Sequence, residues 1–142
     1  MDEYTTRFGI RSIEFIADKG LYLNGKPRKF QGVCNHHDLG PLGAAVNETA
    51  LKHQLRLLKG MGCDAICTSH NMPAPELVRL CEEMGFMMIE PFGEWDIAKC
   101  KNGYHRFFNE DSGDGVTWAE KDMVNMIRQY RNSPCVCHCK GR

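Results

Sequence analysis

Between residues 29 and 139, short apolar runs alternate with amphipathic stretches of helical period, and this alternation limits the fold more than any other feature. The apolar runs are strand candidates at residues 29–34, 64–68, 86–89 and 135–139. The stretches between them are long enough for helices. Strands joined by helices lie parallel in one sheet, with right-handed crossovers. An open doubly wound sheet and an eightfold barrel both fit, and four strands would form half of such a barrel.

Three helices are predicted from their ends as well as from their period. Asn47 can cap a first helix that Gly62 closes, and Pro75 opens a second helix that Gly85 closes. Residues 117–120 read Thr-Trp-Ala-Glu, which is a capping box for a third helix. The expected apolar faces consist of Leu51, Leu55, Leu58 and Met61; of Leu77, Leu80, Cys81 and Met84; and of Met123, Met126, Ile127 and Tyr130.

The segment before the first predicted strand has a different pattern. In residues 11–30, Ile13 and Phe15 alternate with polar residues, and a Leu-Tyr-Leu run leads into Asn24 and Gly25. An Asn-Gly pair suits a tight turn in which both central residues have positive φ. The segment is therefore predicted to form a short β-hairpin ahead of the alternating region.

Charge and composition exclude several classes of function. Lys plus Arg and Asp plus Glu each total 18, so no basic excess indicates a nucleic-acid partner or a membrane surface. The apolar runs are too short to span a bilayer. The Met-Asp-Glu-Tyr start has neither a basic nor an apolar stretch, so we expect no secretory signal and a cytoplasmic location. Eight cysteines without a regular disulfide framework favour a reducing compartment.

The residues that could carry chemistry follow the predicted strands. In parallel α/β folds the reactive groups lie in the loops after the carboxyl ends of strands. The candidate substrate-binding residues there are His36, His37 and Asp38; His70 and Asn71; and Glu90, Glu94 and Trp95. Amides and carboxylates can hydrogen-bond hydroxyl groups and an indole can stack on a sugar, so the set suits a polyhydroxyl ligand. The alternative is that these side chains only pack loops or cap helices.

Several short motifs, in chain order, resemble those of one known family. They lie at residues 8–11 (Phe-Gly-Ile-Arg), 32–40 (Gly-Val-Cys-Asn-His-His-Asp-Leu-Gly), 63–73 (Cys-Asp-Ala-Ile-Cys-Thr-Ser-His-Asn-Met-Pro), 88–95 (Met-Ile-Glu-Pro-Phe-Gly-Glu-Trp), 102–108 (Asn-Gly-Tyr-His-Arg-Phe-Phe) and 131–134 (Arg-Asn-Ser-Pro). Together they resemble glycoside hydrolase family 2, of the β-galactosidase type. The resemblance runs over nearly the whole chain.

This resemblance implies a fold, an activity and two residue roles. Residues 29–142 would form the N-terminal half of an α/β catalytic domain of (β/α)8 TIM-barrel type, with about four parallel strands and three helices. Residues 1–28 would contain the end of a preceding β-sandwich domain and the hairpin. The activity implied is hydrolysis of terminal β-galactosides with retention, without a cofactor or a metal. His70 matches the family's substrate-contacting histidine, and His36 matches a histidine at the sugar site.

The catalytic glutamates of the family have no match in this sequence. In the family, the acid/base follows the fourth strand in an Asn-Glu pair, and the nucleophile follows the seventh strand, about 5 Å away. After Pro134 this chain reads Cys-Val-Cys-His-Cys-Lys-Gly-Arg and ends at Arg142. We therefore expect the 142-residue chain alone to be inactive. Cys67 also replaces an arginine that faces the catalytic carboxylates, which removes a bidentate partner.

Two rival functions follow from the same residues. A half-barrel without the glutamates could be a non-catalytic sugar-binding module, or it could self-associate by pairing its free strand edges with a second copy. Zinc binding by Cys135, Cys137, His138 and Cys139 is the other rival, although the spacing is not the usual Cys-x-x-Cys and a strand turns His138 away from the thiols. We expect a carbohydrate partner, no nucleic acid, no membrane and no metal.

Overall fold

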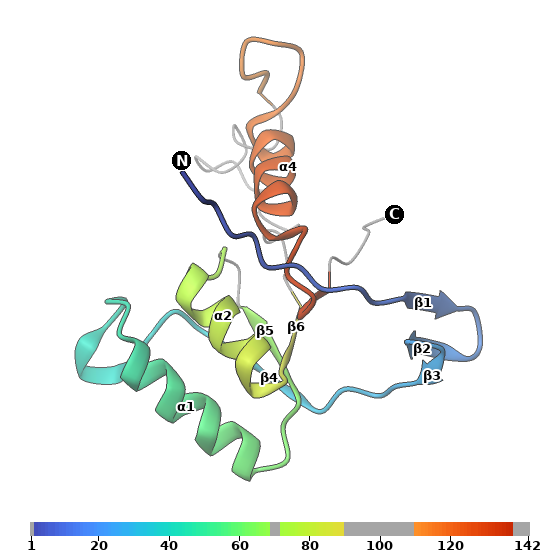
Figure 1. The fold of residues 1–142 in the computed structure, drawn as a ribbon. Helices are drawn as coiled ribbons and strands as arrows, with labels where there is room; N and C mark the ends of the chain where they lie inside the picture. The colour runs from blue at the N-terminus through green and yellow to red at the C-terminus, as the bar shows by residue number, and fades with distance from the viewer. Residues whose placement is uncertain (1, 69–71, 90–109, 138–142) are drawn as a thin grey trace.

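The computed structural model describes residues 2–68, 72–89 and 110–137, which form an antiparallel and a parallel sheet (Figure 1). The antiparallel sheet has the order β1 (Ile13–Ile16), β2 (Gly20–Leu23) and β3 (Lys26–Pro27). The parallel sheet has the order β4 (Gly32–Asn35), β5 (Ala65–Thr68), β6 (Met87–Ile89) and β7 (Val136–Cys137). The helices are η1 (Gly40–Leu42), α1 (Glu48–Gly60), α2 (Pro75–Met84) and α4 (Trp118–Tyr130). Strand order and direction confirm the predicted parallel α/β arrangement.

The Asn-Gly turn forms between β2 and β3. Asn24 and Gly25 have φ of 51° and 72°, and Leu23 pairs directly with Lys26 across them. These are the positive φ values that a two-residue hairpin turn requires. The prediction of a single hairpin is corrected, because Asp18, with φ of 64°, makes an earlier turn and Lys26–Pro27 adds a third strand. Asp18 precedes lysine rather than glycine, so its turn signal is weaker.

Helices α1 and α2 begin and end close to the predicted residues. The Asn47 side chain accepts a hydrogen bond from the Ala50 backbone N–H at 3.0 Å, which caps α1. Gly85 closes α2 in the left-handed region with φ of 73°, and its N–H donates to the Cys81 carbonyl. An ion pair of 2.6 Å between Arg79 and Glu48 joins the two helices. Because both side chains are more than a third exposed, the pair adds little stability.

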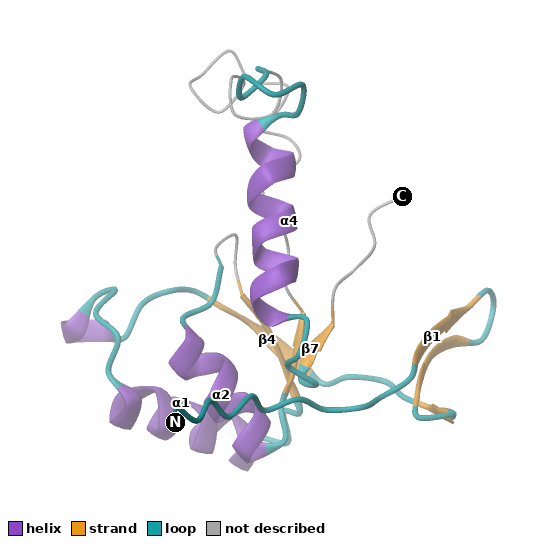
Figure 2. Cartoon of the chain, turned by 45° about the horizontal axis from the view of Figure 1, so that its top comes forward, coloured by secondary structure: helices purple, strands orange, loops and turns teal. Residues whose placement is uncertain are grey.

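The main core lies between the parallel sheet and the helices. Val33, Ile66, Met88 and Val136 form a row in register across the four strands, and the last three have no exposed surface. Figure 2 shows α1 and α2 side by side next to the sheet. The helices contribute Leu55, Leu80 and Cys81, which are fully or almost fully buried, and Phe86, directly before β6, is buried with them. Burial of these apolar side chains is the main stabilising term of the fold.

Helix α4 differs from the prediction in how much of its face is buried. The Thr117 hydroxyl caps it by accepting from the Glu120 N–H at 3.2 Å. Met126 and Tyr130 are buried, and the Tyr130 hydroxyl donates to the Pro73 carbonyl at 2.5 Å. Ile127, expected on the buried face, is 38% exposed. The reason is visible in Figure 1, where α4 meets the sheet at its C-terminal end and extends away from it.

The N-terminal segment crosses the turn between α4 and β7. The Gly9 N–H donates to the Asn132 carbonyl at 3.3 Å, and the Arg11 guanidinium donates to the carbonyls of Ser133 and Val136. A Cβ on Gly9 would lie 2.5 Å from Cβ of Pro134. The motifs at residues 8–11 and 131–134, both part of the family resemblance, are therefore in direct contact.

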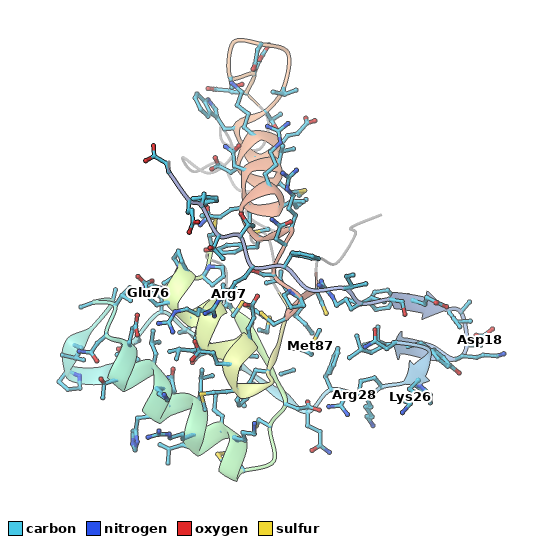
Figure 3. All side chains as sticks on the ribbon, viewed as in Figure 1. Arg7, Asp18, Lys26, Arg28, Glu76 and Met87 are labelled. Atoms are coloured by element: carbon cyan, nitrogen blue, oxygen red, sulfur yellow. The ribbon has the colours of Figure 1, made fainter. Side chains whose placement is uncertain are left out.

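The link between the two sheets is fixed at Asp64. Its carboxylate accepts from the Gln31 backbone N–H at 2.8 Å and pairs with the Arg28 guanidinium. Figure 3 shows Arg28 on the connection between the antiparallel sheet and the parallel one. Asp64 stands immediately before β5, so these bonds help to align the start of β5 with that of β4.

Candidate functional site

The predicted site lies at the carboxyl edge of the parallel sheet. Strand β4 ends at Asn35 and leads directly into His36, His37 and Asp38, while β5 ends beside it at Thr68. The other predicted binding residues, His70, Asn71, Glu90, Glu94 and Trp95, lie outside the described residues. Their roles stay predictions, as does the idea that the three loops meet.

Hydrogen bonds within the loop after β4 hold its predicted site residues. The His37 Nε2 lies 2.9 Å from the Ala44 carbonyl, so this nitrogen carries the proton and donates. An Asp38 carboxylate oxygen accepts from the Gly40 N–H at 2.8 Å. At the strand end, the Asn35 amide donates to the Gln54 side chain of α1 at 3.2 Å. His37 and Asp38 therefore have a structural role in this loop, and their sugar contacts stay a prediction.

A second row of strand residues lies on the face opposite the helices. Cys34, Cys67, Ile89 and Cys137 are in register across β4 to β7, one residue after the buried core row. Successive strand residues point to opposite faces, so this row points away from the α1 and α2 core. Cys34 is exposed and Cys67 half-buried. Cys67, for which the family resemblance predicts an arginine, therefore lies on the face that would become the inside of a closed barrel.

Buried cysteines occur on the helix side of the sheet. Burial, together with the neighbouring Cys135, raises the pKa of the Cys81 thiol, so this group stays protonated at neutral pH. Cys135 lies before β7 and its sulfur is 3.7 Å from the Val78 carbonyl. Strand β7 is Val136–Cys137, so it does not include Cys135, which the strand predicted at residues 135–139 contained. The described residues hold no group of three or more His, Cys, Asp or Glu able to bind a metal, and His138 and Cys139 lie outside them.

A pocket lies behind the loop after β4. Its volume is about 490 Å³, including its open mouth, and its walls come from the loop, from α1 and from the start of α2. The predicted residues His36, His37 and Asp38 line it, and so does Thr68, which is 5% exposed. Sequence reasoning missed Thr68, although its place at the end of a strand could have indicated it.

Comparison with known proteins gives one family. Residues 15–138 match the model described as "Glycosyl hydrolases family 2, TIM barrel domain". The chain is 49% identical over 137 residues to β-galactosidase BoGH2A of Bacteroides ovatus, and 34% identical over 135 residues to a β-glucuronidase of Sus scrofa. A β-glycosidase structure from Bacteroides vulgatus matches 94% of this chain with a TM-score of 0.75 at 39% identity.

The matches involve almost all of this chain but a small part of each relative. They cover 96% of the chain and 15% of the B. ovatus protein, and 95% of the chain and 19% of the S. scrofa protein. For the B. vulgatus structure the share is 17%. No helix in the described ranges is long and apolar enough to cross a membrane. Family match, identity and parallel strand order agree, so this chain belongs to glycoside hydrolase family 2 and forms part of its TIM-barrel domain.

Proposed function

We propose that this chain supplies part of the sugar site of a retaining β-glycosidase that acts on terminal β-galactosides. The observation that carries the proposal is the loop after β4, which places His36, His37 and Asp38 at the carboxyl edge of a parallel sheet. Hydrogen bonds of His37 and Asp38 within this loop fix its shape. In TIM-barrel enzymes this edge carries the active site. Imidazole and carboxylate groups fixed there can hydrogen-bond the hydroxyl groups of a sugar.

A neutral sugar fits the loop better than a uronic acid. Recognition of a carboxylate favours arginine or lysine, and residues 36–46 contain neither. The relative that is 49% identical is named a β-galactosidase, whereas three relatives named β-glucuronidases or putative β-glucuronidases are 30%, 33% and 34% identical. Both observations support the galactoside over the glucuronide.

Cleavage with retention needs two carboxyl groups about 5 Å apart, one as nucleophile and one as acid/base. The sequence offers no match to either family glutamate, so we propose that this segment binds and orients the sugar while both groups come from the rest of a longer protein. The alternative is a non-catalytic sugar-binding or self-associating half-barrel. Because β4 and β7 are the edge strands of the described sheet, pairing with a second copy belongs to that alternative.

The purified 142-residue chain is expected to bind galactose without cleaving galactosides. Calorimetry should show a heat of galactose binding that His36→Ala removes, because the imidazole would lose its contact with a sugar hydroxyl. A matched control is His53→Ala, which changes an exposed histidine on α1 and should leave the binding unchanged. Release of nitrophenol from nitrophenyl β-galactoside should not exceed that of buffer. Turnover by the chain, or tighter binding of glucuronate than of galactose, would contradict the proposal.

A further inference from the structure

The pocket behind the β4 loop lies on the helix side of the sheet. Asn35 reaches Gln54 of α1, so its side chain faces the helices, and Thr68 is its register partner on β5. Ile66, two residues before Thr68 on the same strand face, is in the helix-packed core. The pocket is therefore separated by the strands from the face that bears Cys34 and Cys67.

Thr68 brings a polar group to this pocket without a partner in the protein. The residue is 5% exposed, and its hydroxyl oxygen has no hydrogen-bond partner in the described part of the chain. A buried hydroxyl that forms no hydrogen bond is costly. Most buried polar groups are bonded to protein, to water or to a ligand. A ligand hydroxyl that reached Thr68 would meet a group able both to donate and to accept.

The remaining walls indicate the class of ligand. Leu51, Leu77, Met72 and Pro73 give the pocket apolar surface, and no Lys or Arg is among its described lining residues. A small neutral molecule with one hydroxyl group and an apolar body matches this surface.

We infer that this pocket is a second binding site, which takes a small neutral alcohol or phenol whose hydroxyl bonds to Thr68 and whose apolar part lies against Leu51 and Leu77. The inference does not rest on the proposed sugar cleavage, because it is argued from the Thr68 hydroxyl and from the apolar wall on the helix side of the sheet. It shares the loop that carries His36 to Asp38, so an occupant would also contact the residues that hold this loop.

The test is an NMR titration of the 142-residue chain with phenol, and with toluene as the ligand that lacks the hydroxyl. Phenol is expected to shift the amide signals of Leu51, Thr68 and Leu77 to saturation. Thr68→Val replaces the hydroxyl by a methyl of similar size. It should weaken phenol binding about fivefold and leave toluene binding within about twofold, since one neutral hydrogen bond is lost.

Two further variants keep the test independent of folding defects. Thr49→Val makes the same chemical change on the exposed surface of α1 and should bind phenol like the parent. Thr68→Ser retains the hydroxyl and should keep the preference for phenol over toluene, even if Thr68→Val does not fold. No saturable shift with phenol, or equal phenol affinity of folded Thr68→Val and the parent, would overturn the inference.

Discussion

Replacement of Phe86 with alanine is expected to lower the free energy of unfolding by about 3–5 kcal/mol. Phe86 is 1% exposed and is the largest fully buried side chain in the part of the chain that the structure describes. It lies directly before β6, where it packs in the core formed by α1, α2 and the sheet. Removal of the ring loses its transfer free energy and leaves a cavity that close-packed neighbours fill only in part. Denaturant unfolding followed by circular dichroism measures the change.

Two controls separate the cavity from a general effect of losing an aromatic residue. Phe15→Ala removes a ring that is 69% exposed and should change stability by less than about 0.5 kcal/mol. Phe86→Leu keeps most of the volume and should cost less than the alanine variant. A small domain has about 5–15 kcal/mol of stability in total, so Phe86→Ala should unfold at markedly lower denaturant concentration. An unfolding midpoint equal to that of the parent would show that the described core is wrong.

Replacement of Gly32 with alanine is expected to destabilise the chain by about 1–3 kcal/mol and to displace the site loop. A Cβ at this position would lie 2.5 Å from the Ala65 carbonyl oxygen and 2.9 Å from its carbonyl carbon. Both are backbone atoms of the neighbouring strand, so the β4–β5 pair must move apart. Strand β4 leads into His36 to Asp38, and amide shifts of residues 33–38 should change together with the loss of stability.

Gly60 provides the matched control for this substitution. It is the last residue of α1, and a Cβ there meets nothing within 4 Å. Alanine in a helix has a lower conformational entropy cost than glycine, so Gly60→Ala should be neutral or stabilising by up to about 1 kcal/mol. If both variants destabilised the chain equally, the close approach of β4 and β5 at Gly32 would not be the cause.

The strand–helix order is predictable because its signals are local. The Asn47 cap, the Gly85 stop and the Asn24–Gly25 turn each depend on a few neighbouring residues, and all three form as expected. Helix α4 is less predictable. The period of its apolar residues predicts that Ile127 is buried, but Ile127 is exposed. The distance between α4 and the sheet depends on tertiary contacts, and the spacing of apolar residues carries no information about them.

The sequence predicts which residue types lie at the site and where they lie along the chain, but not which groups they form hydrogen bonds with. Chain order placed His37 and Asp38 after a strand, but their bonds to Ala44 and Gly40 depend on how the loop folds back. Thr68 was not singled out, because its place at the end of a strand was its one signal in the sequence, and threonine is also an ordinary strand residue. Its significance comes from burial and from the pocket, and both depend on α1 and α2.

The most direct test of the central claim is a segment exchange in a relative. Residues 15–137 of this chain would replace the matching segment of B. ovatus β-galactosidase BoGH2A, with and without Cys67→Arg. We expect the chimera to hydrolyse nitrophenyl β-galactoside in preference to the glucuronide, and Cys67→Arg to raise kcat/KM about 10- to 100-fold by restoring a charged hydrogen bond. A folded chimera that hydrolyses neither substrate, with or without Cys67→Arg, or that prefers the glucuronide, would contradict the account.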